Sequence, residues 1–211
     1  MNRRIARMVT LALALAAGTL SNGAVVAAAE PARAIFAGGC FWCVEAAFDA
    51  VPGVIATNPG YTGGTVPNPS YEQVSAGGTG HAEAVEVIYD PERTSYRQLL
   101  AVFWRNIDPY DAGGQFCDRG NQYRSAIFAV DADQRRLAEE SLHSLANSGL
   151  LSAPIATQIT DAGPFYAAEE YHRDYHLKNP ARYKFYRWNC GRDQRLNAVW
   201  GKIGKLPFQD L

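Results

Sequence analysis

Apolar positions along the chain follow two different spacings, and each spacing predicts one kind of element. Short apolar runs that end at Gly, Pro or Asp predict β-strands. Apolar residues three or four positions apart predict amphipathic helices. The strands are predicted at 34–37, 54–61, 82–88, 124–130 and 154–160, and the helices at 41–51, 95–107 and 131–148.

The order of these elements predicts an α/β fold of the α+β sandwich type. The first six elements, β-α-β-β-α-β, reproduce the split βαβ plait of ferredoxin-like folds, with helices on one face of a mostly antiparallel sheet. Beyond residue 160 the chain is aromatic and weakly periodic, apart from a short helical pattern at 167–177. We therefore expect a single domain over 30–211, with a core at about 34–160 and a long, mostly irregular C-terminal tail over 161–211 that wraps it.

The first 29 residues have the pattern of a signal peptide. Arg3, Arg4 and Arg7 precede an apolar run from Val9 to Leu20, and a small-residue stretch ends at Ala29. The run is shorter than the ~20 residues that a membrane-spanning helix needs, so a retained anchor is the weaker alternative. We expect cleavage, export to the periplasm, and no membrane anchor after the leader is removed.

Composition narrows the function classes further. The chain has 211 residues, 47% hydrophobic and 11% aromatic, which is enough for an ordinary core and excludes a disordered protein. The 20 basic and 21 acidic residues form no long block of one sign. We therefore expect no nucleic-acid partner.

The four cysteines offer three kinds of chemistry. In an exported protein they could form two structural disulfides. Cys40 and Cys43, however, stand at Cys-x-x-Cys spacing at the start of a predicted helix. There the helix N-terminus lowers a thiol pKa, so Cys40 is predicted to be a reactive nucleophile. A zinc site is the third alternative, with ligands from Cys117, Cys190, His81 and His172, but their spacing matches no zinc pattern and we predict no metal.

Several motifs together resemble the A-type peptide methionine sulfoxide reductases over about residues 34 to 195. One such motif would be weak evidence, but they occur in the order in which that family has them. They are Gly38-Gly39-Cys40-Phe41-Trp42-Cys43-Val44-Glu45, Gly60-Tyr61-Thr62-Gly63-Gly64, Asn68-Pro69-Ser70-Tyr71-Glu72, Gly80-His81-Ala82-Glu83-Ala84-Val85, Gln122-Tyr123-Arg124-Ser125-Ala126-Ile127, and Gly163-Pro164-Phe165-Tyr166 with Glu170-Tyr171-His172.

The resemblance implies an enzyme that reduces methionine-(S)-sulfoxide, free or in proteins, to methionine. The reaction needs a thiolate, an acid and hydrogen-bond donors to the sulfoxide oxygen, because the sulfur is a poor electrophile until that oxygen is protonated. By motif position, Cys40 supplies the thiolate, Glu83 the acid, and Tyr71 and Tyr123 the donors. Without the resemblance, Glu83 would be expected to face solvent, as is expected of Glu86.

Three further residues are assigned to substrate binding by the same resemblance. Phe41 and Trp42 resemble the apolar cage for the S-methyl group, and Asp118 resembles an acid that orients the site and the substrate backbone. Helix packing is the alternative role for the two aromatics, and turn formation is the alternative for Asp118. His81 and His172 are expected to be structural.

Attack by Cys40 leaves a sulfenic acid that a second thiol converts to an intramolecular disulfide. We favour Cys190 as the resolving cysteine, because the family often carries one on a mobile tail. Cys43 and Cys117 are the alternatives.

Export also has consequences for the partners. The reductant would be a periplasmic or membrane-linked thioredoxin-like protein, and the substrates would be oxidised exported proteins awaiting repair. No flavin or nicotinamide fingerprint is present, so no cofactor is expected, and we predict a monomer. A thioredoxin-like thiol–disulfide oxidoreductase and a metal-binding module are the rival functions.

Overall fold

The protein, seen in a computed structural model that describes residues 29–209, is built around one six-stranded mixed sheet. All neighbouring strands are antiparallel except β6 and β7, which run parallel. The predicted α/β class is confirmed, and each predicted strand is present with slightly different ends. In sheet order the strands are β7 (Gln158–Asp161), β6 (Ser125–Ala129), β1 (Ala32–Gly38), β3 (Ala82–Tyr89), β2 (Val54–Thr62) and β8 (Tyr166–Ala167).

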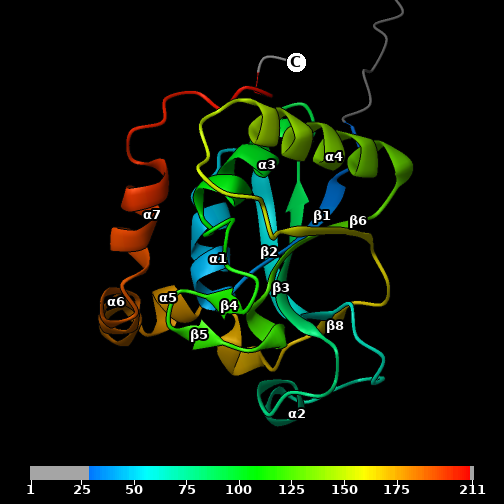
Figure 1. Cartoon of the computed structure of the whole chain (residues 1–211). Coiled ribbons are helices and arrows are strands. Elements are labelled where there is room, and N and C mark those ends of the chain that lie inside the picture. The colour runs from blue at the N-terminus through cyan, green and yellow to red at the C-terminus, as the bar shows by residue number, and fades with distance from the viewer. Residues whose placement is uncertain (1–28, 210–211) are drawn as a thin grey trace, which may run out of the picture.

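The core lies mainly between this sheet and three helices, α1 (Phe41–Asp49), α3 (Tyr96–Arg105) and α4 (Ala132–Asn147) (Figure 1). Strand β1 alternates between the two faces. Phe36 belongs to the main core, where its ring stacks on Phe48 and Phe103 at 4.9 and 5.2 Å. Ile35 belongs to a smaller cluster on the opposite face. Both faces of β1 are therefore buried, which fixes the strand that leads into α1.

The three predicted helices are confirmed, and their first residues show why they start where they do. Ser95 caps α3 in a capping box with Gln98, and the Asp131 side chain accepts a hydrogen bond from the Gln134 amide at the start of α4. Helix α1 starts differently, with Cys40 as its N-cap and no side-chain cap.

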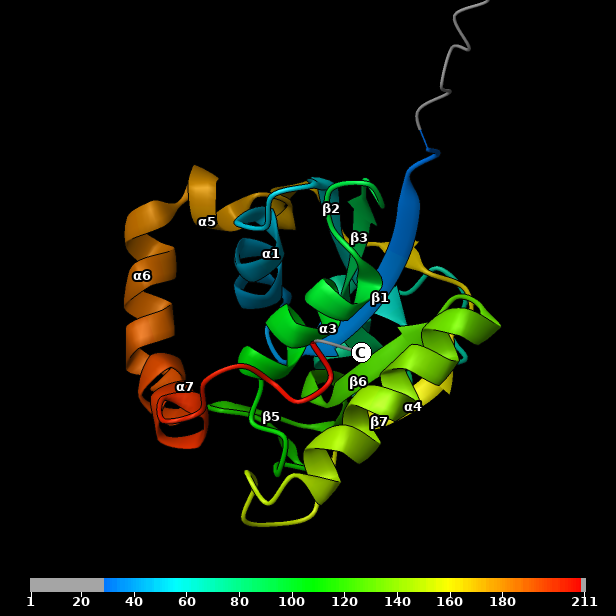
Figure 2. The ribbon, with the colours of Figure 1, turned by 90° about the horizontal axis from the view of Figure 1, so that it is seen from above.

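The prediction of a mostly irregular tail after residue 160 is wrong. The tail holds α5 (Tyr175–Lys178), α6 (Pro180–Asn189) and α7 (Arg192–Trp200), which stand beside α1 on the side away from α4 (Figure 2). Helix α6 has no fully buried residue, so it lacks the apolar stripe on which periodicity depends. The local signals were present, because Pro180 is at the first helical position and Gly191, with φ of 68°, separates α6 from α7.

The predicted helix at 167–177 is also corrected. This segment holds β8, the single 3₁₀ turn η2 (Glu170–His172) and the beginning of α5. Asp174, at the N-cap of α5, has φ of 53°, so the backbone turns there and cannot continue one helix.

Two loops contain short elements that the sequence did not predict. The Gly- and Pro-rich loop after β2 ends in α2 (Tyr71–Ser75). The loop before β6 holds a hairpin of β4 (Gly114–Gln115) and β5 (Asp118–Arg119), and then the 3₁₀ turn η1 (Asn121–Tyr123). A disulfide between Cys117 and Cys190 joins this hairpin to the end of α6, with the two Cα atoms 5.0 Å apart.

The predicted signal peptide, residues 1–29, lies outside the described residues except for its last position. Within residues 29–209, none of the helices combines the length and the apolarity needed to cross a bilayer.

Candidate active site

One pocket of about 270 Å³ brings together every residue that the sequence assigned to catalysis or substrate binding. Strand β1 leads into α1, strand β3 passes beneath it, and α2, the hairpin and η1 close the sides. One further side chain, from α6, completes the wall. The lining residues are Cys40, Phe41, Trp42, Tyr71, Glu83, Asp118, Tyr123 and Tyr186.

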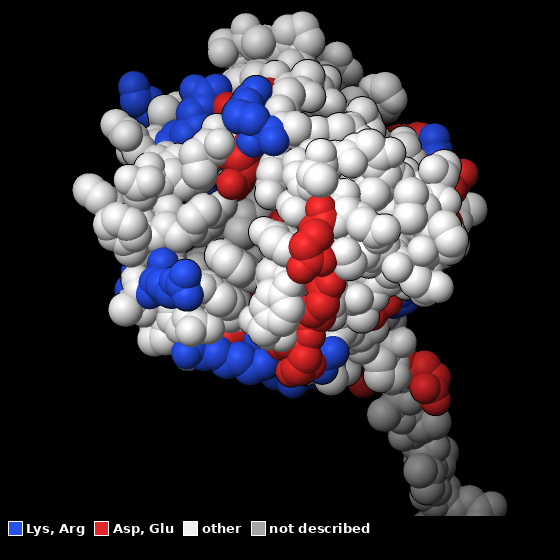
Figure 3. Space-filling model, turned by 90° about the horizontal axis from the view of Figure 1, so that it is seen from below, with Lys and Arg blue, Asp and Glu red and all other residues white. Residues whose placement is uncertain are grey.

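The face that carries α2 and β5 is seen from below in Figure 3. Acidic side chains form a band down the middle of this face, with further acidic and basic side chains towards its edges, and the surface beside that band is hollowed and largely uncharged (Figure 3). Such a surface suits a neutral, partly apolar ligand better than a charged one.

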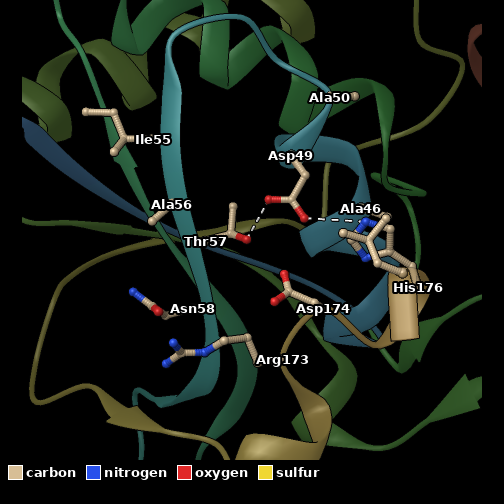
Figure 4. Close-up of a pocket in the computed structure, with 11 residues that line it drawn as sticks. Ala46, Asp49, Ala50, Ile55, Ala56, Thr57, Asn58, Arg173, Asp174 and His176 are labelled. Atoms are coloured by element: carbon tan, nitrogen blue, oxygen red, sulfur yellow. Dashed lines mark hydrogen bonds and ion pairs between the residues drawn. The ribbon is translucent and has the colours of Figure 1, made fainter. Parts of the chain in front are cut away.

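A larger pocket, of about 600 Å³, lies elsewhere, between α1, β2 and α5 (Figure 4). It contains none of the residues assigned to the reaction. Asp49 accepts a hydrogen bond from Thr57 at 2.7 Å and lies 3.5 Å from His176 Nε2. Asp49 and His176 are therefore engaged with each other, and the pocket offers no thiol nucleophile.

The backbone around Gly39 holds Cys40 at the start of α1. Gly39 has φ of +82°, and a Cβ added there would lie 2.6 Å from the Cβ of Gln115. Glycine is therefore required both for the turn and for the close approach of the hairpin. The chain emerges from β1 with Cys40 as the N-cap, only 6% exposed and facing the pocket.

The expected low pKa at Cys40 is not what the structure shows. Burial raises the pKa of Cys40 well above its usual value, with a further contribution from its hydrogen bond to Cys43. That same hydrogen bond, helped by the charges of Arg192 and Arg187, lowers the pKa of Cys43 to about 6. The helix N-terminus is thus outweighed by burial at Cys40, while the hydrogen bond and the two arginines favour the thiolate form of Cys43.

Glu83 lies beneath the first turn of α1. It is 2% exposed, and its Oε2 accepts a hydrogen bond from the Phe41 amide at 3.1 Å. Burial, with smaller contributions from Asp118 and Cys43, raises the pKa of Glu83 to about 8, so the carboxyl is protonated at neutral pH. The alternation along β3 held this signal, because Glu83 shares a face with Val85 and Val87.

Two tyrosines face Glu83 across the pocket. Tyr71 is the first residue of α2, which Ser70 caps, and its amide donates to Glu169 at 2.8 Å. Tyr123 ends η1. Burial, followed by the proximity of Glu83, raises the pKa of Tyr71 to about 12 and raises that of Tyr123 as well. Both phenols therefore stay protonated and can donate hydrogen bonds.

Trp42 is held rigidly at the pocket edge. Its ring stacks on Tyr175 with centroids 3.7 Å apart, and its Nε1 donates to His172 Nδ1 at 3.1 Å. Phe41, almost fully buried, packs against His172 at 4.8 Å. The two aromatics thus pack in the fold, which was the alternative role considered for them, and they also line the pocket.

The alternative zinc site is not supported by the positions of its four residues. His172 accepts from Trp42, and His81 accepts from the Gly64 amide at 3.2 Å, so both histidines have structural partners as expected. Cys117 and Cys190 are joined to each other.

Tyr186 is a lining residue that the sequence did not reveal. Its hydroxyl donates to Asp118 Oδ2 at 2.5 Å, while burial raises the pKa of Asp118 and Tyr186 and Arg192 lower it. Tyr186 lies on α6, which the weak periodicity had hidden. Its spacing from Tyr183 and Cys190, three and four residues, is the signal that places all three on one side of a helix.

The cysteines divide into two pairs. Cys40 and Cys43 are free and buried, whereas Cys117 and Cys190 form the disulfide. Cys190 Sγ lies 4.0 Å from Asp118 Oδ2, so the disulfide adjoins the pocket wall. In this state Cys190 is not a free thiol, and the favoured resolving residue is engaged while Cys43 is available.

Comparisons with known proteins agree on one family. The model of the family described as peptide methionine sulfoxide reductase matches residues 32–203. A peptide methionine sulfoxide reductase of Bacillus licheniformis is 53% identical over 169 residues, which are 80% of this chain and 93% of the relative. A second, from Caulobacter vibrioides, is 48% identical over 195 residues, 92% of this chain and 98% of the relative.

Solved structures agree with the sequences. Methionine sulfoxide reductase A of Corynebacterium diphtheriae superimposes with a TM-score of 0.64 at 35% identity, covering 71% of this chain and 76% of that one. Reduced Mxr1 from Saccharomyces cerevisiae gives a TM-score of 0.62 at 32% identity, covering 72% and 87%.

Proposed function

The chain belongs to the peptide methionine sulfoxide reductase family and is an oxidoreductase of that type, and from this premise we propose that it reduces the S epimer, free or in proteins, with Cys40 as nucleophile. One observation carries the proposal: the pocket that exposes Cys40 also contains a protonated acid, Glu83, and two neutral phenols. A nucleophile, an acid and oxygen-directed donors are what this reaction needs in one place.

The pKa values assign the protons of the first step. Cys40 Sγ attacks the sulfoxide sulfur while its own proton passes to the Cys43 thiolate, its hydrogen-bond partner. Glu83 gives its proton to the sulfoxide oxygen, and Tyr71 and Tyr123 hydrogen-bond that oxygen as its charge develops. The oxygen then transfers to Cys40, which leaves methionine and a Cys40 sulfenic acid.

Cys43 then resolves the sulfenic acid. Its thiol attacks Cys40 Sγ, the S–O bond breaks, water leaves with the Cys43 proton, and a Cys40–Cys43 disulfide forms. This assignment replaces our preference for Cys190, because Cys43 is already within hydrogen-bond reach of Cys40 and Cys190 is bound to Cys117.

The second disulfide then connects the site to the reductant. Cys40 and Cys43 are 6% and 1% exposed, so a protein thiol cannot reach a disulfide between them. Cys117 is exposed, beside Asp118 of the same pocket. We propose that a thioredoxin-like protein reduces Cys117–Cys190, and that Cys190 in turn reduces the internal disulfide.

The signal-peptide pattern of residues 1–29 supports export to the periplasm, repair of oxidised exported proteins, and a periplasmic or membrane-linked reductant. We also propose that the protein is a monomer.

The strand order β6-β1-β3-β2 supports the interpretation of the core as a split βαβ plait.

The test uses peptides with the separate S and R epimers and dithiothreitol as reductant. Wild type is expected to reduce only the S epimer, and Cys40→Ser is expected to lose activity by about 10⁴-fold, because the nucleophile is absent. C117S/C190S serves as the control, since it removes the surface disulfide and leaves both pocket thiols in place. Reduction of the R epimer, or full activity of Cys40→Ser, would refute the proposal.

A further inference from the structure

The surface disulfide is asymmetric, and its two sulfurs have different surroundings. We propose that an external thiolate attacks Cys117 Sγ and expels Cys190 as the leaving thiolate, so that electrons enter at Cys117 and are released at Cys190, beside the pocket. The inference rests on the proposed function, which gives this disulfide its part in turnover, and deepens it by assigning a separate role to each sulfur.

The first asymmetry is access. A thiolate approaches a disulfide along the S–S axis, from the side opposite the sulfur that leaves. Cys117 lies in the turn of the β4–β5 hairpin and is exposed. Cys190 is half-buried at the end of α6, packed towards Asp118. Attack on Cys117 therefore starts from solvent, whereas Cys190 is the less accessible of the two sulfurs.

The second asymmetry is the stabilisation of the leaving group. The backbone N–H of Cys117 points at Cys190 Sγ, with a nitrogen–sulfur distance of 3.2 Å. A hydrogen-bond donor to sulfur stabilises a thiolate, and a more stable thiolate leaves faster. Among the described residues, the polar contact of Cys117 Sγ is with an acceptor, Asp118 Oδ1, at 3.8 Å.

Neither the Asp118 carboxylate nor the two helix ends near the disulfide reverses this preference. The Asp118 carboxylate is almost equally distant from the two sulfurs, 3.8 Å from Cys117 and 4.0 Å from Cys190. Helix α6 ends at Cys190 and α7 begins after Gly191, so the negative end of one helix dipole and the positive end of the other meet there and oppose each other. The amide of Cys117 remains as the group that distinguishes the two sulfurs.

The exchange balances without any further reagent. A thiolate of a protein dithiol forms a bond to Cys117 Sγ, the Cys117–Cys190 bond breaks, and its electron pair stays on Cys190. The second thiol of the reductant then attacks its own sulfur in the mixed disulfide and releases Cys117. The reductant is oxidised to a disulfide, and Cys117 and Cys190 are both reduced.

The test maps the mixed disulfide directly. The oxidised double variant C40S/C43S retains only the Cys117–Cys190 pair, and it is mixed with a bacterial thioredoxin whose second active-site cysteine is serine. N-ethylmaleimide is added first to block the free thiols, and acid then stops exchange. Mass spectrometry of the digest locates both modifications. We expect thioredoxin on Cys117 and maleimide on Cys190, in about ten-fold excess over the reverse arrangement.

Two controls separate the causes. The same reaction in urea removes the hydrogen bond and the shielding, and it should give nearly equal attachment to both sulfurs. Glutathione in place of thioredoxin should again select Cys117, because the asymmetry belongs to this chain. Attachment mainly to Cys190, equal attachment in the folded protein, selection by thioredoxin but not by glutathione, or no mixed disulfide would each overturn the proposal. None of these outcomes involves sulfoxide reduction, so a failure of the proposed function is recognised separately.

Discussion

The two cysteine pairs have one neighbour in common, Asp118, but they differ in burial, in oxidation state and in the distance between their members along the chain. Cys40 and Cys43 are buried, reduced and three residues apart on one helix. Cys117 and Cys190 are oxidised, closer to solvent and 73 residues apart, and they join a hairpin to a helix end. In the proposed function the first pair carries out the buried chemistry, and the second exchanges electrons with another protein.

This difference shows how burial separates two requirements that a single disulfide cannot meet. A sulfenic acid is best protected where no thiol except the resolving one can reach it, whereas reduction by a protein requires a sulfur at the surface. Tyr186 and Asp118 lie between the pairs, joined by a hydrogen bond of 2.5 Å. Substitutions on each side of this boundary should therefore affect different steps.

The largest effect after loss of the nucleophile is expected at the buried acid. Glu83→Gln keeps the shape of the side chain but cannot give a proton, so kcat/KM should fall by about 10³-fold. Wild type should lose activity above about pH 8, as Glu83 ionises, and the variant should lack this descending limb. Pre-steady-state methionine release measured across pH tests both points, and an unchanged limb in the variant would exclude Glu83 as the acid.

Cys43→Ser should lower the rate of the first step by about 10²-fold at pH 7, because Cys40 loses the base that accepts its proton. The wild-type rate should fall below about pH 6, where Cys43 becomes protonated, and this limb should be absent from the variant. After one turnover without reductant, dimedone should label Cys40 in the variant but not in wild type. A Cys40–Cys190 disulfide in the variant would restore Cys190 as a resolving residue.

A substitution of the surface pair should distinguish the two kinds of reductant. The double variant C117S/C190S should keep its dithiothreitol-driven rate within about two-fold, because this small thiol enters the pocket. Its rate with a thioredoxin–thioredoxin reductase system should fall by about ten-fold. Steady-state assays with the two reductants, with a thermal melt as the folding control, measure the ratio. Equal losses with both reductants would mean that the disulfide only supports the fold.

The smallest effect is expected at the boundary between the pairs. Tyr186→Phe removes one hydrogen bond to Asp118 and retains the ring, which corresponds to a loss of about three- to ten-fold in kcat/KM. Tyr110→Phe, which removes one hydrogen bond from the Ser152 amide and lies outside the pocket lining, is the matched control. If the two variants behave alike, Tyr186 has no specific part in positioning the substrate.

The central fold was predictable from periodicity, and the C-terminal helices were not, for a physical reason. Strands β1 and β3 and helix α3 are buried in the core, so their apolar spacing reflects their structure. Helix α6 is held by Tyr186, by the disulfide of its cap residue and by its polar ends, and none of these contributes an apolar repeat. The hairpin of β4 and β5 is too short to leave a pattern at all.

The members of the site other than Tyr186 were predictable from motifs, but their ionisation was not. Sequence places Cys40 at a helix start, where the dipole favours a thiolate. The competing contribution, burial beneath hairpin and tail, depends on contacts between distant segments. The same holds for Glu83, whose raised pKa comes first from burial. Cys117 and Cys190 were each considered as partners of Cys40, whereas the fold joins them to one another.

The presence of two cysteine pairs also sets how many sulfoxides one chain could reduce before it needs a reductant. Each reduction of a sulfoxide consumes two electrons, which is the content of one dithiol. With all four cysteines reduced, each pair can supply two electrons, and the enzyme would release two methionines per chain before it needed a partner. In the state seen here, with the surface pair oxidised, it would release one and then wait. If the proposed function holds, the second pair stores one further reduction, so that turnover would continue through a brief shortage of reductant.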